Sequence, residues 1–192
     1  FVQSCEVLAA IEESSIIVVI DPPLDVAASL IINGKSRGKT VVWSPSLLTN
    51  YGFSILEQYM RNVDYLILNQ QEAISLTSIN DGIQACTKIS TIVTGTVVVT
   101  LGHEGCVLCS SGKGRIIPSP QLSLYGLNVV STVGAGDTLV GAFAAFKEKG
   151  FEDVRALYLA NIAAALKTTR VETRGSPTYD EIQRYARDEN SS

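Results

Sequence analysis

The chain has 192 residues and a formal net charge of −4, with 46% hydrophobic and 18% charged residues. This length and composition predict a globular protein with a substantial core and exclude a disordered chain. Lysine and arginine form no cluster, so binding to nucleic acid is not expected. No apolar run approaches the roughly 20 residues of a membrane helix, and no signal peptide is evident, so we expect no membrane association.

The four cysteines do not suggest a disulfide scaffold in a chain of this size. Cys106 and Cys109 form a CxxC pair, but no second pair or nearby histidine completes a zinc site. We therefore expect small apolar residues in a reduced, cytoplasmic protein.

Short β-branched runs alternate with helical stretches over the first hundred residues. The predicted strands are 15–21, 40–44, 64–69 and 96–101, and the predicted helices are 24–33, 55–60, 72–76 and 81–92. Continuous apolar strands that alternate with helices are typical of a parallel sheet covered on both faces, an α/β fold.

The pattern changes after residue 101. Predicted strands 105–110 and 115–118 flank a Ser-Gly-Lys-Gly turn, which is a hairpin signal. A strand-like segment, 127–130, then leads into a glycine loop, and helices follow at 137–149, 153–168 and 178–187. We interpret residues 1–187 as one nucleotide-binding, catalytic part and residues 188–192 as a polar tail.

Polar residues and glycines follow several of the predicted parallel strands. Asp21, Ser44, Asn69 and 100–102 stand at the strand ends. Ligands of open α/β sheets bind beyond the carboxyl ends of the strands, so this edge is where we expect a site. The segments 34–36 and 38–40 resemble the end of a P-loop, but they lie between a helix and a strand in the wrong order for phosphate binding.

The segment from Val129 to Phe143 carries the clearest chemistry. Gly134 and Gly136 let the backbone approach a ligand closely, and a helix N-terminus directly after them attracts anions. Asp137 in the first helical turn has two interpretations. It either complements the helix dipole, or it accepts a proton from a hydroxyl that attacks phosphorus.

The sequence Gly134-Ala-Gly-Asp137 resembles the signature of the ribokinase-like (PfkB) carbohydrate kinases, Asp-Thr-x-Gly-Ala-Gly-Asp. The resemblance implies a three-layer α/β/α sandwich with a mostly parallel sheet. It also implies phosphoryl transfer from ATP to a hydroxyl of a sugar or nucleoside. Gly134, Ala135 and Gly136 would then form the anion hole, and Asp137 would be the base.

Three further segments resemble the family in order and spacing. Asn69 and Glu72 match an Asn-x-x-Glu motif, which implies Mg²⁺ held through water by Glu72; the alternative is a capping box. Thr100, Gly102 and Gly105 match the Thr-Leu-Gly-x-x-Gly motif along the ATP phosphates, or else form a tight turn. Asn161 lies in the helix that borders adenine, where a packing face is the alternative.

Two departures from the family pattern stand out. Ser131 replaces the first Asp of the signature, which speaks against activation by K⁺, whereas Thr132 is retained beside the nucleotide. Family members also run about a hundred residues longer at the N-terminus, so the first strands and the lid are absent from this chain. The alternative function is therefore a catalytically inactive relative that serves as a binding or assembly module.

The resemblance leaves the acceptor open, because the selective residues of the family lie mostly upstream. Ribose and pseudouridine are both candidates. Ser131 and the sequence from Gly134 to Gly141 resemble the kinase half of bifunctional pseudouridine-metabolising proteins. A homodimer of the full-length protein is one arrangement left open.

Overall fold

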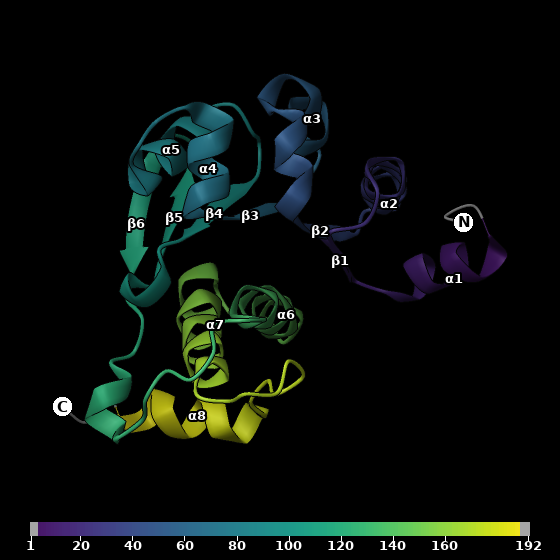
Figure 1. Ribbon diagram of the computed structural model, residues 1–192. Helices are drawn as coiled ribbons and strands as arrows, with labels where there is room; N and C mark the ends of the chain where they lie inside the picture. The colour runs from purple at the N-terminus through teal and green to yellow at the C-terminus, as the bar shows by residue number, and fades with distance from the viewer. Residues whose placement is uncertain (1–3, 189–192) are drawn as a thin grey trace. The chain divides into compact units, whose positions relative to one another are not determined.

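The computed structural model describes residues 4–188, which form two compact units (Figure 1). The sheet unit runs from Ser4 to Leu101 and includes Val107–Arg115. The helical unit comprises Gly102–Cys106 and the chain from Ile116 onward. A single domain over 1–187 stays a prediction. The predicted tail at 188–192 lies outside the described residues except for Asp188, which ends a helix.

Six strands form one sheet in the order in which they follow along the chain. They are β1 (Ile16–Ile20), β2 (Thr40–Ser44), β3 (Tyr65–Asn69), β4 (Thr96–Thr100), β5 (Cys106–Ser110) and β6 (Lys113–Ile117). The first four are parallel, with Ile20 opposite Ser44 and Asn69 opposite Thr100. Their carboxyl ends therefore meet at one edge, and the predicted α/β class with a mostly parallel sheet is confirmed.

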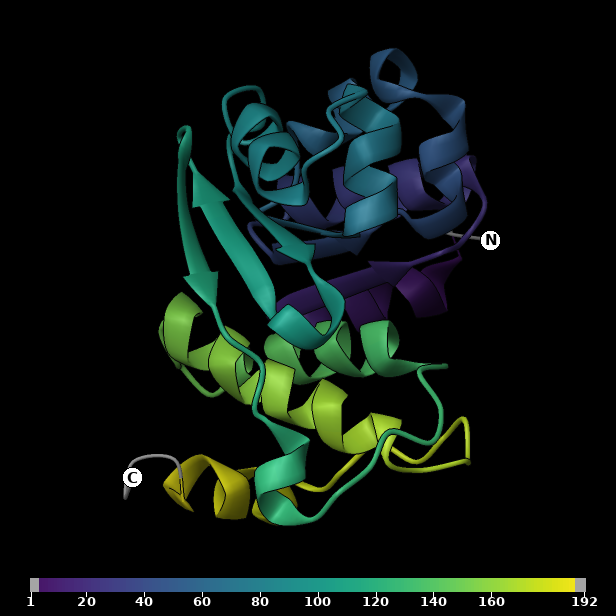
Figure 2. The same ribbon diagram turned by 60° about the vertical axis from the view of Figure 1, so that its left-hand side comes forward.

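Strands β5 and β6 form the predicted hairpin and run in opposite directions (Figure 2). Ser111 and Gly112 connect them with φ angles of 49° and 76°. Two positive φ values match the turn that follows the right-handed twist of a hairpin.

The helices of the sheet unit pack along the parallel strands, and Figure 2 shows α3, α4 and α5 as a blue-to-teal layer. They are α1 (Cys5–Glu13), α2 (Leu24–Ser36), α3 (Phe53–Met60), α4 (Gln70–Thr77) and α5 (Gly82–Ile89). Three successive residues are buried in each of β2, β3 and β4, as expected for strands covered on both faces. Strand β1 differs, because Val18 and Ile20 are 39% and 37% exposed.

Three helices make up most of the helical unit: α6 (Ala135–Glu148), α7 (Asp153–Thr168) and α8 (Tyr179–Asp188). Helix α7 packs against both α6 and α8. Leu139, Phe143 and Phe146 of α6 are buried. None of the helices within residues 4–188 is long and apolar enough to cross a membrane.

The segment 127–130, predicted as strand-like, is not a strand. Its valines gave a β pattern, but the amides of Val130 and Ser131 both donate to the carbonyl of Thr168 at the end of α7, at 2.7 and 3.0 Å. The backbone amides of this segment thus bond to a helix end rather than to a sheet edge. Helix α6 also begins at Ala135, two residues before the predicted start at Asp137.

The two segments that resemble a P-loop have structural roles. Gly34 and Lys35 lie in the last turn of α2, and the Nζ of Lys35 contacts an Asp64 carboxylate oxygen at 2.7 Å. Lys39 donates to the carbonyl of Glu12 at 2.6 Å. Neither segment places free amides at a helix N-terminus, so the sequence prediction is confirmed.

Gly34 and Gly141 are helical glycines for which we predict opposite effects of alanine. A Cβ on Gly34 would lie 2.7 Å from Cδ1 of Ile17 and 3.0 Å from Cγ2 of Val41, whereas a Cβ on Gly141 would meet nothing within 4 Å. We expect Gly34→Ala to lower the free energy of unfolding by roughly 1–3 kcal/mol through overpacking. Gly141→Ala should raise it by roughly 0.5–1 kcal/mol. Urea unfolding of both variants tests this, and equal effects would contradict the close packing of α2 on the sheet.

Candidate active site

The N-terminus of α6 has no side-chain cap. Gly134 occupies the N-cap position with φ 78° and makes no capping hydrogen bond. The amide of Ala135 donates to the Thr132 carbonyl at 3.2 Å, whereas those of Gly136 and Asp137 have no partner among the described residues. The helix therefore presents free donors, together with the positive end of its dipole, to any anion that approaches.

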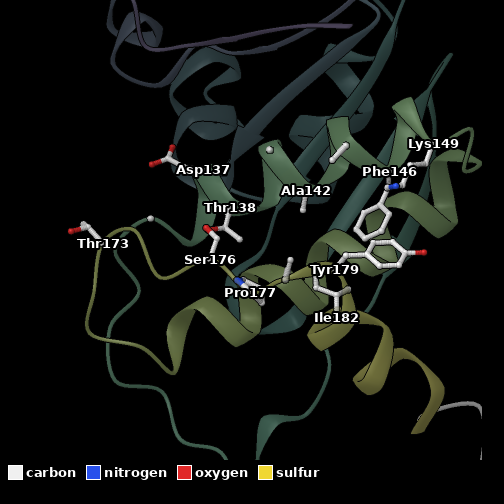
Figure 3. Close-up of a pocket in the computed structure, with 14 residues that line it drawn as sticks. Asp137, Thr138, Ala142, Phe146, Lys149, Thr173, Ser176, Pro177, Tyr179 and Ile182 are labelled. Atoms are coloured by element: carbon white, nitrogen blue, oxygen red, sulfur yellow. The ribbon is translucent and has the colours of Figure 1, made fainter. Parts of the chain in front are cut away.

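Asp137 is exposed, and its carboxylate makes no hydrogen bond or ion pair within the described part of the chain. Figure 3 shows it projecting outward from the first turn of α6. The next residue, Thr138, points the other way and is buried, with Oγ1 2.9 Å from Oγ of Ser176. The Asp137 side chain therefore does not cap its own helix, and its contribution to helix stability is limited to the dipole.

Two cavities of the helical unit, each of about 450 Å³, border this loop. Gly134 and Asp137 line the first, together with the apolar side chains of Phe146 and Ile182 (Figure 3). The second, mainly apolar cavity is lined by five of the predicted nucleotide or anion contacts: Gly102, Gly105, Thr132, Ala135 and Asn161. Both volumes lie in the range of small-molecule sites.

Gly105 shapes the second cavity because no other residue fits there. Its φ is 105°, and a Cβ would lie 2.2 Å from the Ile117 carbonyl oxygen and 2.6 Å from the Ser119 nitrogen. Gly102 also has a positive φ, 64°, but an added Cβ would meet open space. His103, which lies between them, is exposed and lines the same cavity.

Asn161 lies in α7 and is only 3% exposed. Its Nδ2 donates to the carbonyls of Ile117 and Pro118 at 3.1 and 3.3 Å, and it lies 3.5 Å from Sγ of Cys106. Burial raises the pKa of the Cys106 thiol to about 11. Asn161 thus fixes the segment after β6 and also lines the second cavity. Packing and contact with adenine therefore both remain supported as interpretations of this residue.

Asn69 and Glu72 form a full capping box at the start of α4 in the sheet unit. The Asn69 side chain accepts from the Glu72 amide at 2.9 Å, and Glu72 accepts from the Asn69 amide at 2.9 Å and from Nδ2 at 2.6 Å. Thr100 stands opposite Asn69 at the end of β4. The capping alternative is therefore realised in the structure, and a role toward Mg²⁺ stays a prediction.

The carboxylate of Glu72 lies in an unfavourable electrostatic setting. Partial burial raises its pKa, the amide of Asn69 opposes this, and the negative charge of Asp21 adds to the rise. Asp21 follows β1 with a positive φ of 47°. Within residues 4–188, no three side chains of His, Cys, Asp or Glu come together as a metal site.

The sequence analysis missed one polar residue of the helical unit. Lys167 in α7 is fully buried, and its Nζ has no hydrogen-bond partner in the described structure. The available signal was a lone lysine directly after the apolar run from Ala163 to Leu166.

The family model described as pfkB family carbohydrate kinase matches residues 5–179. The chain belongs to this family. The ribokinase of Haemophilus influenzae is 28% identical over 155 residues, which is 77% of this chain and 47% of that protein. The chain spans about half the length, or less, of the first curated relatives that it matches.

Solved structures share the fold of this pfkB-family chain. The ribokinase of Arabidopsis thaliana, complexed with ribose and ATP, has a TM-score of 0.80 at 24% identity, covering 95% of this chain and 59% of that one. The adenosine kinase of Sinorhizobium meliloti has a TM-score of 0.78 at 22% identity, covering 95% and 56%. The expected ribokinase-like fold is thus confirmed.

We predict that Asp21→Asn lowers the pKa of Glu72, because it removes the repulsion between the two carboxylates. The native pKa of Glu72 lies above its ordinary value of 4.5, so folding stability falls as the pH rises through that interval. The variant should lose less stability over the same range. NMR titration of the Glu72 carboxyl carbon, with urea unfolding at several pH values, measures both effects.

Asp25→Asn is the matched control, since Asp25 lies in the first turn of α2 and is not among the groups that shift Glu72. A Glu72 titration that is the same in the Asp21 variant and in the wild type would rule out the interaction.

Proposed function

We propose that the protein transfers the γ-phosphoryl group of ATP to a hydroxyl of a sugar or nucleoside, with Asp137 as the base. The observation that carries the proposal is the exposed, unpaired carboxylate beside an uncapped helix N-terminus with free amides. A helix end of this kind suits a phosphoryl group, and a carboxylate next to it suits the alcohol that attacks. The membership in the pfkB family supports the same reaction.

In this mechanism Asp137 accepts the proton of the acceptor hydroxyl as its oxygen bonds to the γ-phosphorus. The bond from that phosphorus to the bridging oxygen breaks, and ADP leaves with the bridging electrons. Free amides at Gly136 and Asp137, with Gly134 opening the loop, donate to the phosphoryl oxygens. Charge that develops during transfer is thereby stabilised by donors already in place.

The nucleotide is proposed to occupy the second cavity. Gly102, Gly105 and Thr132 would lie along the phosphates, and Asn161 beside adenine. Asn69 and Thr100 are proposed to contribute from the carboxyl ends of β3 and β4. The fit rests on the volume of the cavity and on the predicted contact residues that line it.

Glu72 is proposed to hold Mg²⁺ through water, and the ion would neutralise charge on the triphosphate. Both oxygens of Glu72 already accept hydrogen bonds from Asn69, which suits an indirect contact better than direct ligation. The neutral side chain of Ser131 argues against a requirement for K⁺. We further propose that the enzyme is cytoplasmic and acts on ribose or pseudouridine. When full-length, it is proposed to form a homodimer.

The second candidate function is a catalytically inactive binding or assembly module. Ser131, which replaces the first Asp of the family signature, favours it. We expect the 192 residues alone to bind ATP weakly and to turn over little. Robust phosphorylation of a sugar by this chain would contradict that expectation.

We predict that Asp137→Asn lowers kcat by about a hundredfold or more and changes nucleotide affinity only a few-fold. The amide cannot accept the hydroxyl proton, whereas the backbone donors that bind phosphate stay in place. Turnover with ribose and with pseudouridine is measured in the longest natural form of the protein, and ADP affinity by calorimetry. The control is Asp180→Asn, which removes an acidic side chain from the first turn of α8. An undiminished kcat in the Asp137 variant would remove the base assignment.

A further inference from the structure

Burial of the Lys167 side chain is energetically unfavourable for the helical unit. It lies in the last turn of α7, has 0% exposure, and its Nζ has no hydrogen-bond partner within residues 4–188. A buried charge without a counter-charge strongly opposes folding, and a methionine or leucine would fill the same space at lower cost. The fold itself therefore gives no reason for a lysine at this position.

The Lys167 side chain extends toward the phosphate loop. Its Cε lies 3.6 Å from the position that a Cβ on Gly134 would take, and the carbonyl oxygen of Thr173 lies 3.4 Å from the same position. One turn earlier on α7, Ala163 lines the cavity that contains Asp137. The side chain of Lys167 thus lies beside Gly134, the N-cap residue of α6.

The ordinary explanation for a lysine at a helix C-terminus is that it complements the helix dipole. Lys88 in the last turn of α5 fits this explanation, because it is exposed and its ammonium stays hydrated. Lys167 does not, since the dipole of a single helix end offsets only a small part of the cost of burial. A negatively charged ligand would supply the counter-charge for Lys167.

The neutral side chain of Ser131 also supports a negatively charged ligand near Lys167. Its amide and that of Val130 donate to the carbonyl of Thr168, the residue after Lys167, so the loop and the lysine are joined at one turn of α7. An acidic residue at position 131 would place a negative charge in this loop. With the neutral Ser131, the Nζ of Lys167 has no hydrogen-bond partner in the part of the chain that the structure describes, and its field acts on whatever the loop binds.

We propose that Lys167 is a built-in cation of the phosphate site, which supports the loop from behind and makes phosphate binding independent of a monovalent metal ion. Lys167 is proposed as a positioning residue, because it is fully buried beside Gly134 and would act on the ligand through the loop. The inference rests on the proposed function only in the identity of the anion, a phosphoryl group.

The test compares Lys167→Met with the wild type in phosphate-free buffer. Methionine has a similar volume without the charge, so the melting temperature should rise, while the affinity for pyrophosphate and for ADP should fall about tenfold or more. Lys88→Met, a lysine at the same place in an exposed helix end, should change neither. A merely structural lysine would give the opposite sign for the melting temperature.

A second arm uses the wild type and Lys167→Ala in salts of equal ionic strength. Binding of pyrophosphate to the wild type should be equal in potassium chloride and in choline chloride. The alanine variant should regain at least part of its lost affinity when ammonium chloride replaces choline chloride, because the small cation fits the space that the side chain leaves. A wild type that requires K⁺, or an alanine variant that ammonium does not rescue, would overturn the proposal.

The outcomes separate this inference from the proposed function. Equal pyrophosphate affinity in Lys167→Met and the wild type overturns the role of Lys167 and leaves the kinase mechanism in place. Weaker affinity in Lys167→Met, together with undiminished turnover in Asp137→Asn, supports the built-in cation and removes the base. Should Lys167→Met fail to fold, the lysine serves the fold and the proposal is wrong; Lys167→Arg, which keeps the charge, should bind pyrophosphate as the wild type does.

Discussion

The unsatisfied N-terminus of α6 is the constraint on which the candidate site depends. Side chains cap α1, α4 and α5, whereas α2, α3, α6 and α7 have no side-chain cap. At α6 the N-cap is Gly134, which adopts a left-handed conformation and offers no acceptor. Glycine at this position leaves the helix donors free and the backbone open, and an anion is the natural partner for the donors that remain.

The sequence allowed most of the fold to be predicted because its parallel strands are apolar runs with clear ends. Strands β2 and β4 follow the predicted ranges closely, and the register of the parallel strands brings their polar ends together. The prediction of a strand at 127–130 was wrong for a physical reason. Its valines have a high β-propensity, but the backbone amides of Val130 and Ser131 bond to the end of α7. Propensity describes the side chains, whereas the partner of the backbone is decided by tertiary structure.

The candidate site could be predicted only in part from the sequence. Gly134 and Asp137 stand out by local pattern, and the structure leaves that carboxylate exposed and unpaired. The close contact that demands glycine at position 105 comes from Ile117 and Ser119, which no local pattern relates to it. Lys167 was missed because a lysine near a helix end is usually solvated, and burial by distant segments is not visible in the sequence.

Each unit by itself carries a charge that its own residues leave uncompensated. In the sheet unit, partial burial raises the pKa of Glu72, and the negative charge of Asp21 adds to the rise. In the helical unit Lys167 is buried without a counter-charge. Such imbalances persist where they serve a ligand of the opposite sign, because the ligand restores in the complex the stability that the free protein lacks. The complements that we propose are a cation beside Asp21 and Glu72 in the sheet unit and a phosphoryl group near Lys167 in the helical unit.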